Sequence, residues 1–245
     1  MFDFLRRKPR AGSITKPRVD LHSHLIPGLD DGVSTLEEAL EILLRFEQAG
    51  YKKIITTPHV MGDFYKNTST SIKSGLKELQ DFARGKTDLI IEAAAEYYLD
   101  EGFMEILSGK DEVLTIGSKN VLFETSFMAE PVYLREAIFK MQSLGLKPIL
   151  AHPERYIYLH ENPQLMKDLF ERGVHFQINI NSLIGYYSKP VQKQAQKMIN
   201  SGMFHYLGSD CHNMMHLDAT FEAMNHRLFY KAMEHKVLND KLLPT

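Results

Sequence analysis

The stretch VDLHSHLIPGLDDG, residues 19–32, combines residue types that can bind a divalent metal. His22 and His24 are two residues apart, so on a strand both imidazoles would point to the same side. A Pro-Gly turn then brings Asp30 and Asp31 back towards the histidines. Imidazoles and a carboxylate at a strand end suit a transition metal. Two solvated histidines on an exposed loop are the alternative interpretation.

Metal-capable residues recur farther along the chain, each where a short apolar run ends. They are His59 after residues 53–57, Glu96 after 89–95, Glu124 after 121–123, His152 after 148–151, and Asp210 and His212 after 204–207. Taken singly, each also suits a turn, a solvated loop or a buried histidine with a satisfied hydrogen bond. Their recurrence at six of seven predicted strand ends favours one shared metal centre.

The elements that must position these residues repeat one plan of apolar strand, polar loop, amphipathic helix and glycine stop. Helices are expected to start at about residue 36 and to cover 71–83, 131–144, 163–172, 189–200 and 217–237, and a further strand covers 175–180. This alternation predicts an α/β fold with a parallel sheet. Ligands from nearly every strand end require a shared mouth, so we expect a distorted seven-stranded (β/α) barrel rather than an open Rossmann-like sheet.

Composition excludes several classes of protein. The 245 residues are 44% hydrophobic and 24% charged with a net charge of -2, which favours a globular protein and gives no indication of nucleic-acid binding. No apolar run approaches the roughly 20 residues of a membrane span, and residues 1–5 are too short for a secretory signal. A single cysteine, Cys211, fits a reducing cytoplasm.

Only the N-terminus has an unusual composition. Residues 1–17 are basic, with an apolar start, and are expected to be a flexible arm. Weak contact of this arm with an anionic membrane surface is the alternative. Residues 18–245 are predicted to form one domain, and the oligomeric state is not predicted.

The motifs, taken in order, resemble the PHP (polymerase and histidinol phosphatase) superfamily, and within it the bacterial capsule-type tyrosine phosphatases. The matching stretches are His22-Ser23-His24, Thr57-Pro58-His59, Ala151-His152-Pro153-Glu154-Arg155 and Ser209-Asp210-Cys211-His212-Asn213. The resemblance runs from about Val19 to the end of the folded chain. It implies a distorted seven-stranded barrel with three divalent ions, commonly manganese, iron or zinc.

The resemblance also implies a distribution of ligands over three ions. His22, His24, Glu96 and Asp210 would hold the first ion; Glu96, Glu124 and His152 the second; and Asp31, His59 and His212 the third. Arg155 matches the arginine that grips the substrate phosphate. A second arginine that the family often carries is absent from Asn213-Met214-Met215-His216-Leu217, and His216 is its candidate replacement.

Charge arithmetic supports a phosphate substrate. Four carboxylates against three divalent ions leave a surplus of about +2, which suits a phosphomonoester dianion. We therefore expect metal-activated hydroxide to hydrolyse a phosphomonoester. The resemblance implies that this ester is phosphotyrosine, with His216 or a metal-bound water protonating the leaving phenolate. The resemblance implies a tyrosine autokinase that controls capsule or exopolysaccharide synthesis as the partner. A small-molecule phosphatase, such as histidinol phosphatase, is the alternative.

Two rival classes fit the sequence less well. A cysteine phosphatase needs an arginine six residues after its nucleophile, but Leu217 stands there after Cys211. A structural zinc module would be rich in cysteine. Aromatic residues that could stack on a phenyl ring are Tyr97, Tyr98, Tyr156, Tyr186 and Tyr187.

Overall fold

The computed structural model describes residues 16–244 and alternates parallel strands with helices, as the sequence predicts for an α/β fold. The predicted N-terminal arm therefore lies outside the described residues, except for Lys16 and Pro17. Within the described range the strands are β1 Val19–Asp20, β2 Lys53–Thr56, β3 His59–Val60, β4 Ile90–Ala93, β5 Glu96–Tyr98, β6 Asn120–Glu124, β7 Lys147–Ala151, β8 His175–Asn179 and β9 Tyr206–Gly208.

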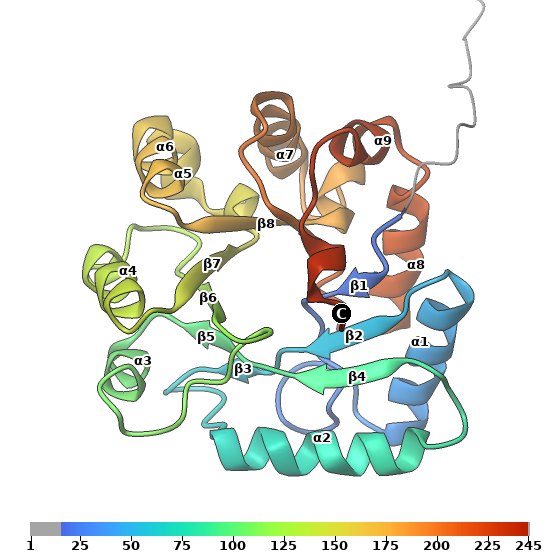
Figure 1. The fold of residues 1–245 in the computed structure, drawn as a ribbon. Helices are drawn as coiled ribbons and strands as arrows, with labels where there is room; N and C mark the ends of the chain where they lie inside the picture. The colour runs from blue at the N-terminus through green and yellow to red at the C-terminus, as the bar shows by residue number, and fades with distance from the viewer. Residues whose placement is uncertain (1–15, 245) are drawn as a thin grey trace, which may run out of the picture.

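The helices lie on the outside of the strands (Figure 1). They are α1 Leu36–Gln48, α2 Ser69–Ala83, α3 Glu101–Ile106, α4 Leu134–Ser143, α5 Ile157–Glu161, α6 Pro163–Glu171, α7 Lys189–Ser201, α8 Met214–Ala223 and α9 Arg227–Met233, with short 3-10 helices η1 Pro153–Arg155, η2 Ile180–Ile184 and η3 Asn239–Leu242. None of those in residues 16–244 is both long enough and apolar enough to cross a membrane.

All strand pairs are parallel and form two sheets, in the orders β1-β2-β4 and β3-β5-β6-β7-β8-β9. The strands predicted over 53–57 and 89–95 form β2 and β4, and each is followed after a short interruption by a further strand, β3 or β5, that was not predicted. Pro58 lies in the first gap and has no N–H for a ladder bond. Backbone hydrogen bonds from Ala94 to Thr56 (2.9 Å) and from Glu96 to Pro58 (3.1 Å) carry the pairing across both interruptions.

Backbone and side-chain hydrogen bonds link the segments that contain β1 and β9. The backbone N–H of His24 donates to the carbonyl of Cys211 (2.8 Å), beside an isolated parallel bridge between Ser23 and Cys211. Farther down, Asn239 donates to the carbonyls of Val19 (2.9 Å) and Leu207 (2.7 Å). The C-terminal segment thus fastens the first strand to the last, and Figure 1 shows it in front of the strands.

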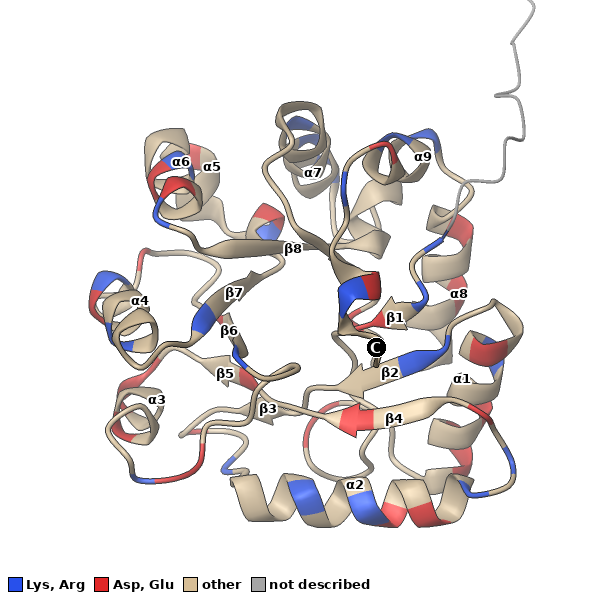
Figure 2. Ribbon diagram, viewed as in Figure 1, with Lys and Arg blue, Asp and Glu red and all other residues tan. Residues whose placement is uncertain are grey.

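The helices begin and end where local chemistry dictates, as α7 illustrates. The Ser188 side chain accepts a hydrogen bond from the Val191 N–H at its start, and Gly202 adopts φ 69° at its end, where a left-handed residue terminates the helix. The side chains of Ala195 and Ile199, four residues apart, are fully buried. Figure 2 shows Lys and Arg interspersed with Asp and Glu along the outer helices.

One helix prediction was wrong, and the short helices α3 and α5 were not predicted. The tail predicted as one helix over 217–237 forms α8 and α9, because a turn at 224–226 interrupts it and the His226 side chain caps α9. The six-residue α3 was missed because so short a helix shows no periodicity. Its start is set by Asp100, whose carboxylate accepts from the Phe103 N–H (2.8 Å).

We predict that His205 makes folding stability depend on pH. Its Nδ1 accepts a hydrogen bond from the Phe176 N–H (3.1 Å), and burial together with the neighbouring His175 lowers its pKa from 6.5 to about 4. As pH falls below about 6.5 the unfolded chain takes up a proton that the folded chain resists, so stability decreases.

An asparagine side chain at this position would keep the acceptor without titrating, so His205→Asn should flatten this decline. After a discount for the part of the ring that water reaches, the difference between pH 7 and pH 5 should be about 1 kcal/mol, or roughly 2–4 °C in Tm. Thermal unfolding of both proteins across this range measures it. Parallel Tm curves would contradict the prediction.

Candidate metal centre

A cavity of about 740 Å³ opens at the C-terminal ends of the strands, and we refer to it as the pocket. It is lined by Asp31, His59, Met61, Tyr98, Glu124, Ser126, Phe127, Met128, His152, Arg155, Tyr186, Tyr187, Asp210, His212, Asn213 and His216. The remaining predicted ligands, His22, His24 and Glu96, lie fully buried and contact these residues from below. The structure therefore brings together all nine residues that the sequence predicted as ligands.

The most deeply buried group consists of His22, His24, Glu96 and Asp210. Nε2 of His22 lies 3.1 Å from Oε2 of Glu96, 3.3 Å from Nε2 of His24 and 3.3 Å from Oδ1 of Asp210. Two ligands about 2.1 Å from a shared ion, at a tetrahedral or octahedral angle, are about 3.0–3.4 Å apart. The spacing of the four ligand atoms therefore fits one cation.

Hydrogen bonds on the far side of each ring explain why these nitrogens can bind metal. Nδ1 of His22 lies 2.7 Å from Oε1 of Gln177, and Nδ1 of His24 lies 2.6 Å from Oδ2 of Asp30. Both partners are acceptors, so each Nδ1 carries the proton and each Nε2 carries a lone pair. When both rings are neutral, the two lone pairs face each other and two carboxylates, an arrangement that repels unless a positive charge, a metal ion or a proton, lies between them.

Without a metal ion, the same excess of negative charge favours a proton on His22. Burial alone would lower the pKa of His22, but Glu96 and Asp210 raise it to about 9. In Asp210, burial is outweighed by His22 and its neighbours, so the pKa of this carboxyl falls well below 3.8. The chain thus holds its carboxylates ionised around a point that favours positive charge.

The other predicted groups surround this one. Oδ1 of Asp31 lies 3.6 Å from Nε2 of His59 and 3.5 Å from Nε2 of His212, which is the spacing of a second group that also includes His24. Glu96 and Glu124 form a third group with His59.

His152, predicted to share an ion with Glu96 and Glu124, places Nε2 3.1 Å from Oε1 of Glu96 and 3.9 Å from Oε2 of Glu124. Nδ1 of His59 lies 3.2 Å from Oε2 of Glu96 and 3.1 Å from Oε1 of Glu124, and the buried Nδ1 of His152 has no hydrogen-bond partner among the described residues. These donor sets of histidine and carboxylate therefore fit divalent ions.

Two of the metal-site residues have unusual backbone conformations. His152 has φ 32° and Asp210 has φ 52°, in the left-handed region that non-glycine residues rarely adopt. The neighbouring contacts hold both in place: the Asp210 N–H donates to the His22 carbonyl (2.9 Å), and η1 follows directly after His152. Such strain at a site suggests a functional constraint.

Strand β8 supports the centre with residues that were not predicted. Gln177 and Asn179 are fully buried; the Gln177 amide donates to the Asn179 side chain (2.8 Å), which donates to Oδ2 of Asp210 (2.7 Å). Oε1 of Gln177 also accepts from His22. The signal was present, because two amides alternate with apolar residues in His-Phe-Gln-Ile-Asn, but nothing in the sequence shows which atoms they meet.

Glu154 was also missed as a supporting residue. It is fully buried, and its Oε1 accepts from the Asn179 N–H (2.9 Å) and the Ser182 hydroxyl (2.7 Å). Burial raises its pKa. Glu154 thereby fastens η1, which carries Arg155, to the end of β8.

Arg155 reaches the pocket between two aromatic rings. Its guanidinium carbon lies 4.6 Å from the ring centre of Phe127 and 4.3 Å from that of Tyr187. One amino group donates to Oδ2 of Asp210 (3.1 Å). The two rings hold the guanidinium in place, and the side chain stays 24% exposed, so that it can reach a ligand in the pocket.

Cys211 does not face the pocket. Its thiol is fully buried in the hydrophobic core, and burial raises its pKa far above the ordinary value of 9.0. A thiol held in this way is a poor nucleophile.

His216 lines the pocket, with Nδ1 3.2 Å from the Asp210 carbonyl. Burial and the neighbouring His212 lower its pKa. Its role as a proton donor stays a prediction. Of the five tyrosines considered, Tyr98, Tyr186 and Tyr187 line the pocket, whereas Tyr97 and Tyr156 belong to the core.

Comparisons with known proteins identify the family of the chain. The family model for capsular polysaccharide synthesis proteins CpsB/CapC matches residues 18–240. A CapC protein of Staphylococcus aureus is 28% identical over 232 residues, covering 93% of this chain and 91% of the relative. Tyrosine-protein phosphatase YwqE of Bacillus subtilis is 28% identical over 198 residues, covering 80% and 78%.

The fold is also similar to a solved structure from work on YwqE of Bacillus subtilis and CpsB of Streptococcus pneumoniae, which are described as metal-dependent tyrosine phosphatases. The TM-score is 0.78 at 24% identity, and the match covers 92% of this chain and 95% of the other.

We predict that Asp30 tunes metal affinity without binding metal itself. Its carboxylate accepts from His24 Nδ1 and from the backbone N–H of His59 (2.9 Å) and Gly32 (3.0 Å). Asp30→Asn should weaken binding of Mn²⁺ by about 10–100-fold, the usual effect of losing an outer carboxylate. Calorimetric titration of the metal-free protein measures this.

The control is Asp63→Asn, which removes the same charge from an exposed position on a nearby turn. It should bind Mn²⁺ as the unchanged chain does. An affinity of Asp30→Asn within twofold of the control would show that Asp30 does not orient His24.

Proposed function

The chain belongs to the CpsB/CapC family of capsular polysaccharide synthesis proteins, and we propose that it is a metal-dependent protein-tyrosine phosphatase. The observation that carries this proposal is the group of buried nitrogen and oxygen acceptors at the floor of the pocket, whose spacing fits a bound cation. The names of the relatives support the choice of tyrosine phosphate as substrate.

The reaction is hydrolysis of a phosphomonoester. Water attacks phosphorus, the bond between phosphorus and the phenolic oxygen breaks, and the phenolate takes up a proton. Bound divalent cations would supply Lewis acidity and lower the pKa of water towards about 7. The chain would contribute charge and position: its carboxylates and histidines hold the cations, and Arg155 presents its edge to two phosphate oxygens.

We assign three ions to the centre, probed best with Mn²⁺, although Fe and Zn suit the same donors. His22, His24, Glu96 and Asp210 would hold one. Glu96, Glu124 and His152 would hold a second, and Asp31, His59 and His212 would hold a third. Glu96 is shared because its two oxygens face different histidines, Oε2 towards His22 and Oε1 towards His152.

One centre with ligands from this many strands requires the C-terminal ends of the strands to surround a common cavity. We infer that the two sheets form a distorted seven-stranded barrel. If β2 with β3 and β4 with β5 are each taken as one interrupted strand, the pairing orders join into a single series from β1 to β9. The bridge between Ser23 and Cys211 supports a closed series.

The substrate proposed is a phosphotyrosyl protein, with a bacterial tyrosine autokinase as partner. Tyr98, Phe127, Tyr186 and Tyr187 line the pocket, which supports recognition of a phenyl ring. A small-molecule phosphatase such as histidinol phosphatase is the alternative, and a competition between phosphotyrosine peptides, phosphoserine peptides and histidinol phosphate separates the two.

Metal removal tests the mechanism. Prolonged incubation with excess chelator should abolish hydrolysis of a phosphotyrosine peptide, and Mn²⁺ should restore it, because the carboxylates and histidines cannot neutralise a phosphate dianion alone. Steady-state assays before and after dialysis measure this. Full activity in excess chelator would contradict the proposal.

Cys211→Ser provides the accompanying test of the rival cysteine chemistry. The thiol is buried away from the pocket, so this variant should retain activity within a few-fold and should respond to chelator and Mn²⁺ like the unchanged chain. A loss of several orders of magnitude would restore the cysteine mechanism.

Arg155 should contribute mainly to substrate binding. Arg155→Ala should lower kcat/KM about 10²-fold, or roughly 3 kcal/mol, mostly through KM, since the phosphate oxygens change charge only modestly in a loose transition state. Arg155→Lys should recover part of the loss, because an ammonium cannot make the two-pronged contact.

Saturating Mn²⁺ is needed in this assay because Arg155 also contacts Asp210. Arg135→Ala is the control, since this arginine is 62% exposed on α4. A change of less than threefold for Arg155→Ala would mean that the metals alone hold the phosphate.

A further inference from the structure

Large apolar side chains are exposed around the pocket. Phe64, Met128 and Met215 are 73%, 69% and 71% exposed, and Phe127 and Tyr186 are 38% and 43% exposed. We call these five residues the apolar rim. They come from four separate connections, after β3, after β6, after η2 and at the start of α8. Exposed apolar groups clustered around a polar cavity usually mark a binding surface.

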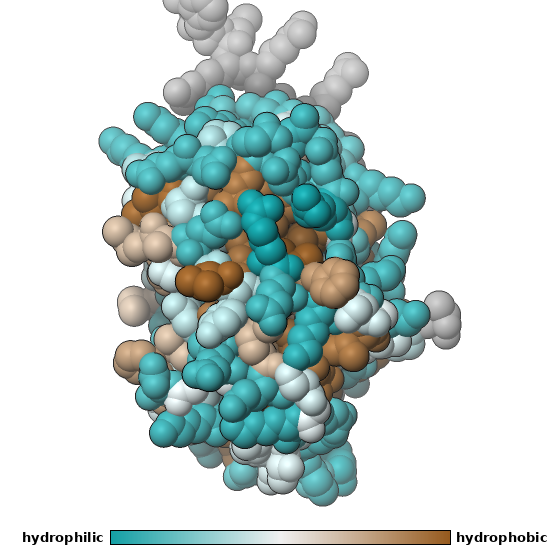
Figure 3. Space-filling view, turned by 90° about the vertical axis from the view of Figure 1, so that its left-hand side faces the viewer, coloured by the Kyte–Doolittle hydropathy of each residue, from teal (hydrophilic) through white to brown (hydrophobic). Residues whose placement is uncertain are grey.

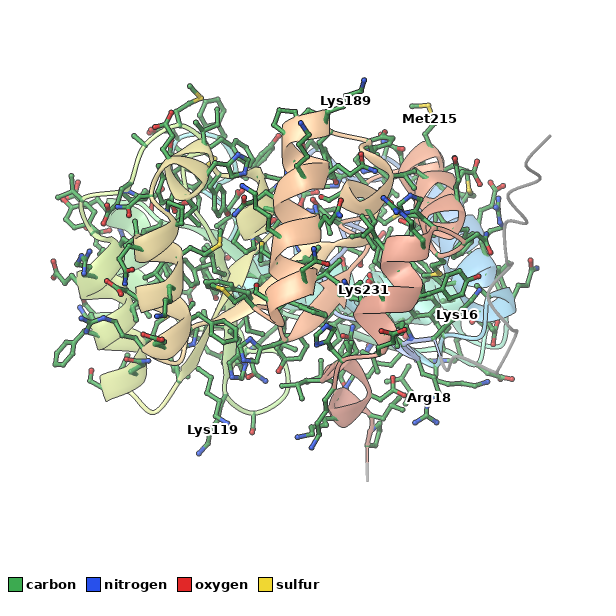
Figure 4. All side chains as sticks on the ribbon, turned by 90° about the horizontal axis from the view of Figure 1, so that it is seen from above. Lys16, Arg18, Lys119, Lys189, Met215 and Lys231 are labelled. Carbon is green, nitrogen blue, oxygen red and sulfur yellow. The ribbon has the colours of Figure 1, made fainter. Side chains whose placement is uncertain are left out.

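The rim lies on the side of the molecule to which the strands' C-terminal ends point. Figure 4 shows Met215 and Lys189, which follow strand ends, projecting from one side, and Lys119 and Arg18, which precede strands, on the opposite side. Phe64 lies at the tip of a tight turn in which the N–H groups of Phe64 and Tyr65 donate to the Met61 carbonyl (3.2 and 2.9 Å).

That turn is held against the metal site. The ring of Tyr65 stacks on that of His59, with centres 5.5 Å apart, and Met61 lines the pocket. Phe64 is therefore part of a turn that begins at the pocket residue Met61, although it does not line the cavity itself.

The rim and the pocket share residues. Phe127, Met128 and Tyr186 line the cavity and are also partly exposed above it. A single phosphorylated phenol would cover these three but would leave Phe64 and Met215 in water. A polypeptide that carries the same group would cover all five.

We propose that the apolar rim binds apolar residues that flank the phosphotyrosine in a polypeptide substrate. This inference rests on the proposed function and names the class of substrate that suits it. A second copy of the chain, or a membrane, that covered the rim would also cover the pocket, because the two share residues, and would keep a phosphorylated substrate out. A ligand that contacts the rim and the pocket at the same time must therefore carry the phosphate itself. Methionine and aromatic side chains suit such a surface because they adapt to varied apolar partners.

The test measures binding of two peptides to the Mn²⁺-loaded full chain by calorimetry. Both carry a non-hydrolysable phosphonate analogue of phosphotyrosine, flanked in one by Leu and Phe and in the other by Ser and Gly. The unchanged chain should bind the apolar peptide about tenfold more tightly, and the double variant Phe64→Ser/Met215→Ser should lose this preference.

Phe139→Ser is the matched control. Phe139 is 72% exposed, as Phe64 is, but it belongs to α4, on the side of the molecule that faces the viewer in Figure 3, where apolar patches are interspersed with hydrophilic surface. This variant should keep the full preference for the apolar peptide.

Three results would overturn the proposal. The first is that the unchanged chain binds both peptides equally, and the second is that the double variant keeps the preference for the apolar peptide. The third is that the double variant differs from the unchanged chain in oligomeric mass or in binding to vesicles. A parallel assay with the hydrolysable phosphotyrosine peptide separates the two proposals. Tight binding that depends on the rim but is not followed by hydrolysis would refute the phosphatase function, and the proposal that the rim binds apolar flanking residues would still hold.

Discussion

The repulsion among buried acceptors is the constraint on which the rest of the structure depends. His22, His24, Glu96 and Asp210 direct lone pairs at one another across 3.1–3.5 Å, with almost no access of water. A buried group of this kind is costly unless a cation neutralises it. The surrounding chain keeps the acceptors in place: Gln177 and Asp30 hold the two rings, and Asn179 and Arg155 hold Asp210.

The parallel strands bring the metal-binding side chains together. Each parallel strand delivers its C-terminal residues to the same side, but β2 and β4 are interrupted before their continuations supply His59 and Glu96. The interruption at Pro58 lets the chain change course without losing the backbone pairing on either side. At the junction of β1 with β9, Asp20 accepts from both the N–H and the hydroxyl of Ser209 (2.8 Å each), which places Asp210 opposite His22.

The floor and the walls of the pocket differ in polarity. The floor is charged, whereas the walls and the rim are aromatic or apolar, and Phe127 contacts both Arg155 and the ring of His152. A polar floor recognises a phosphate, and apolar walls favour an aryl ester over a sugar or an alkyl alcohol. The exposed rim extends this preference from the phenol to its polypeptide neighbours.

Much of the candidate site was predictable because its ligands are local in sequence. Spacing such as His22-Ser23-His24, and the recurrence of His, Glu and Asp after apolar runs, depends only on the alternation of side chains along a strand. The α/β class followed from the same alternation of elements. The family of the chain follows from these motifs as well, and the matching family model confirms it.

Tertiary structure decided everything that depends on contacts between distant segments. Gln177 meets His22 across 155 residues of sequence, and Asn179 meets Asp210 across 31, so no local pattern could reveal their roles. The same holds for Arg155, whose guanidinium is held between Phe127 and Tyr187 only because three connections converge. The sequence by itself determined which atoms can bind metal, since donor chemistry belongs to the residue; the fold determined which lone pairs face one another, since that depends on the packing of the whole chain.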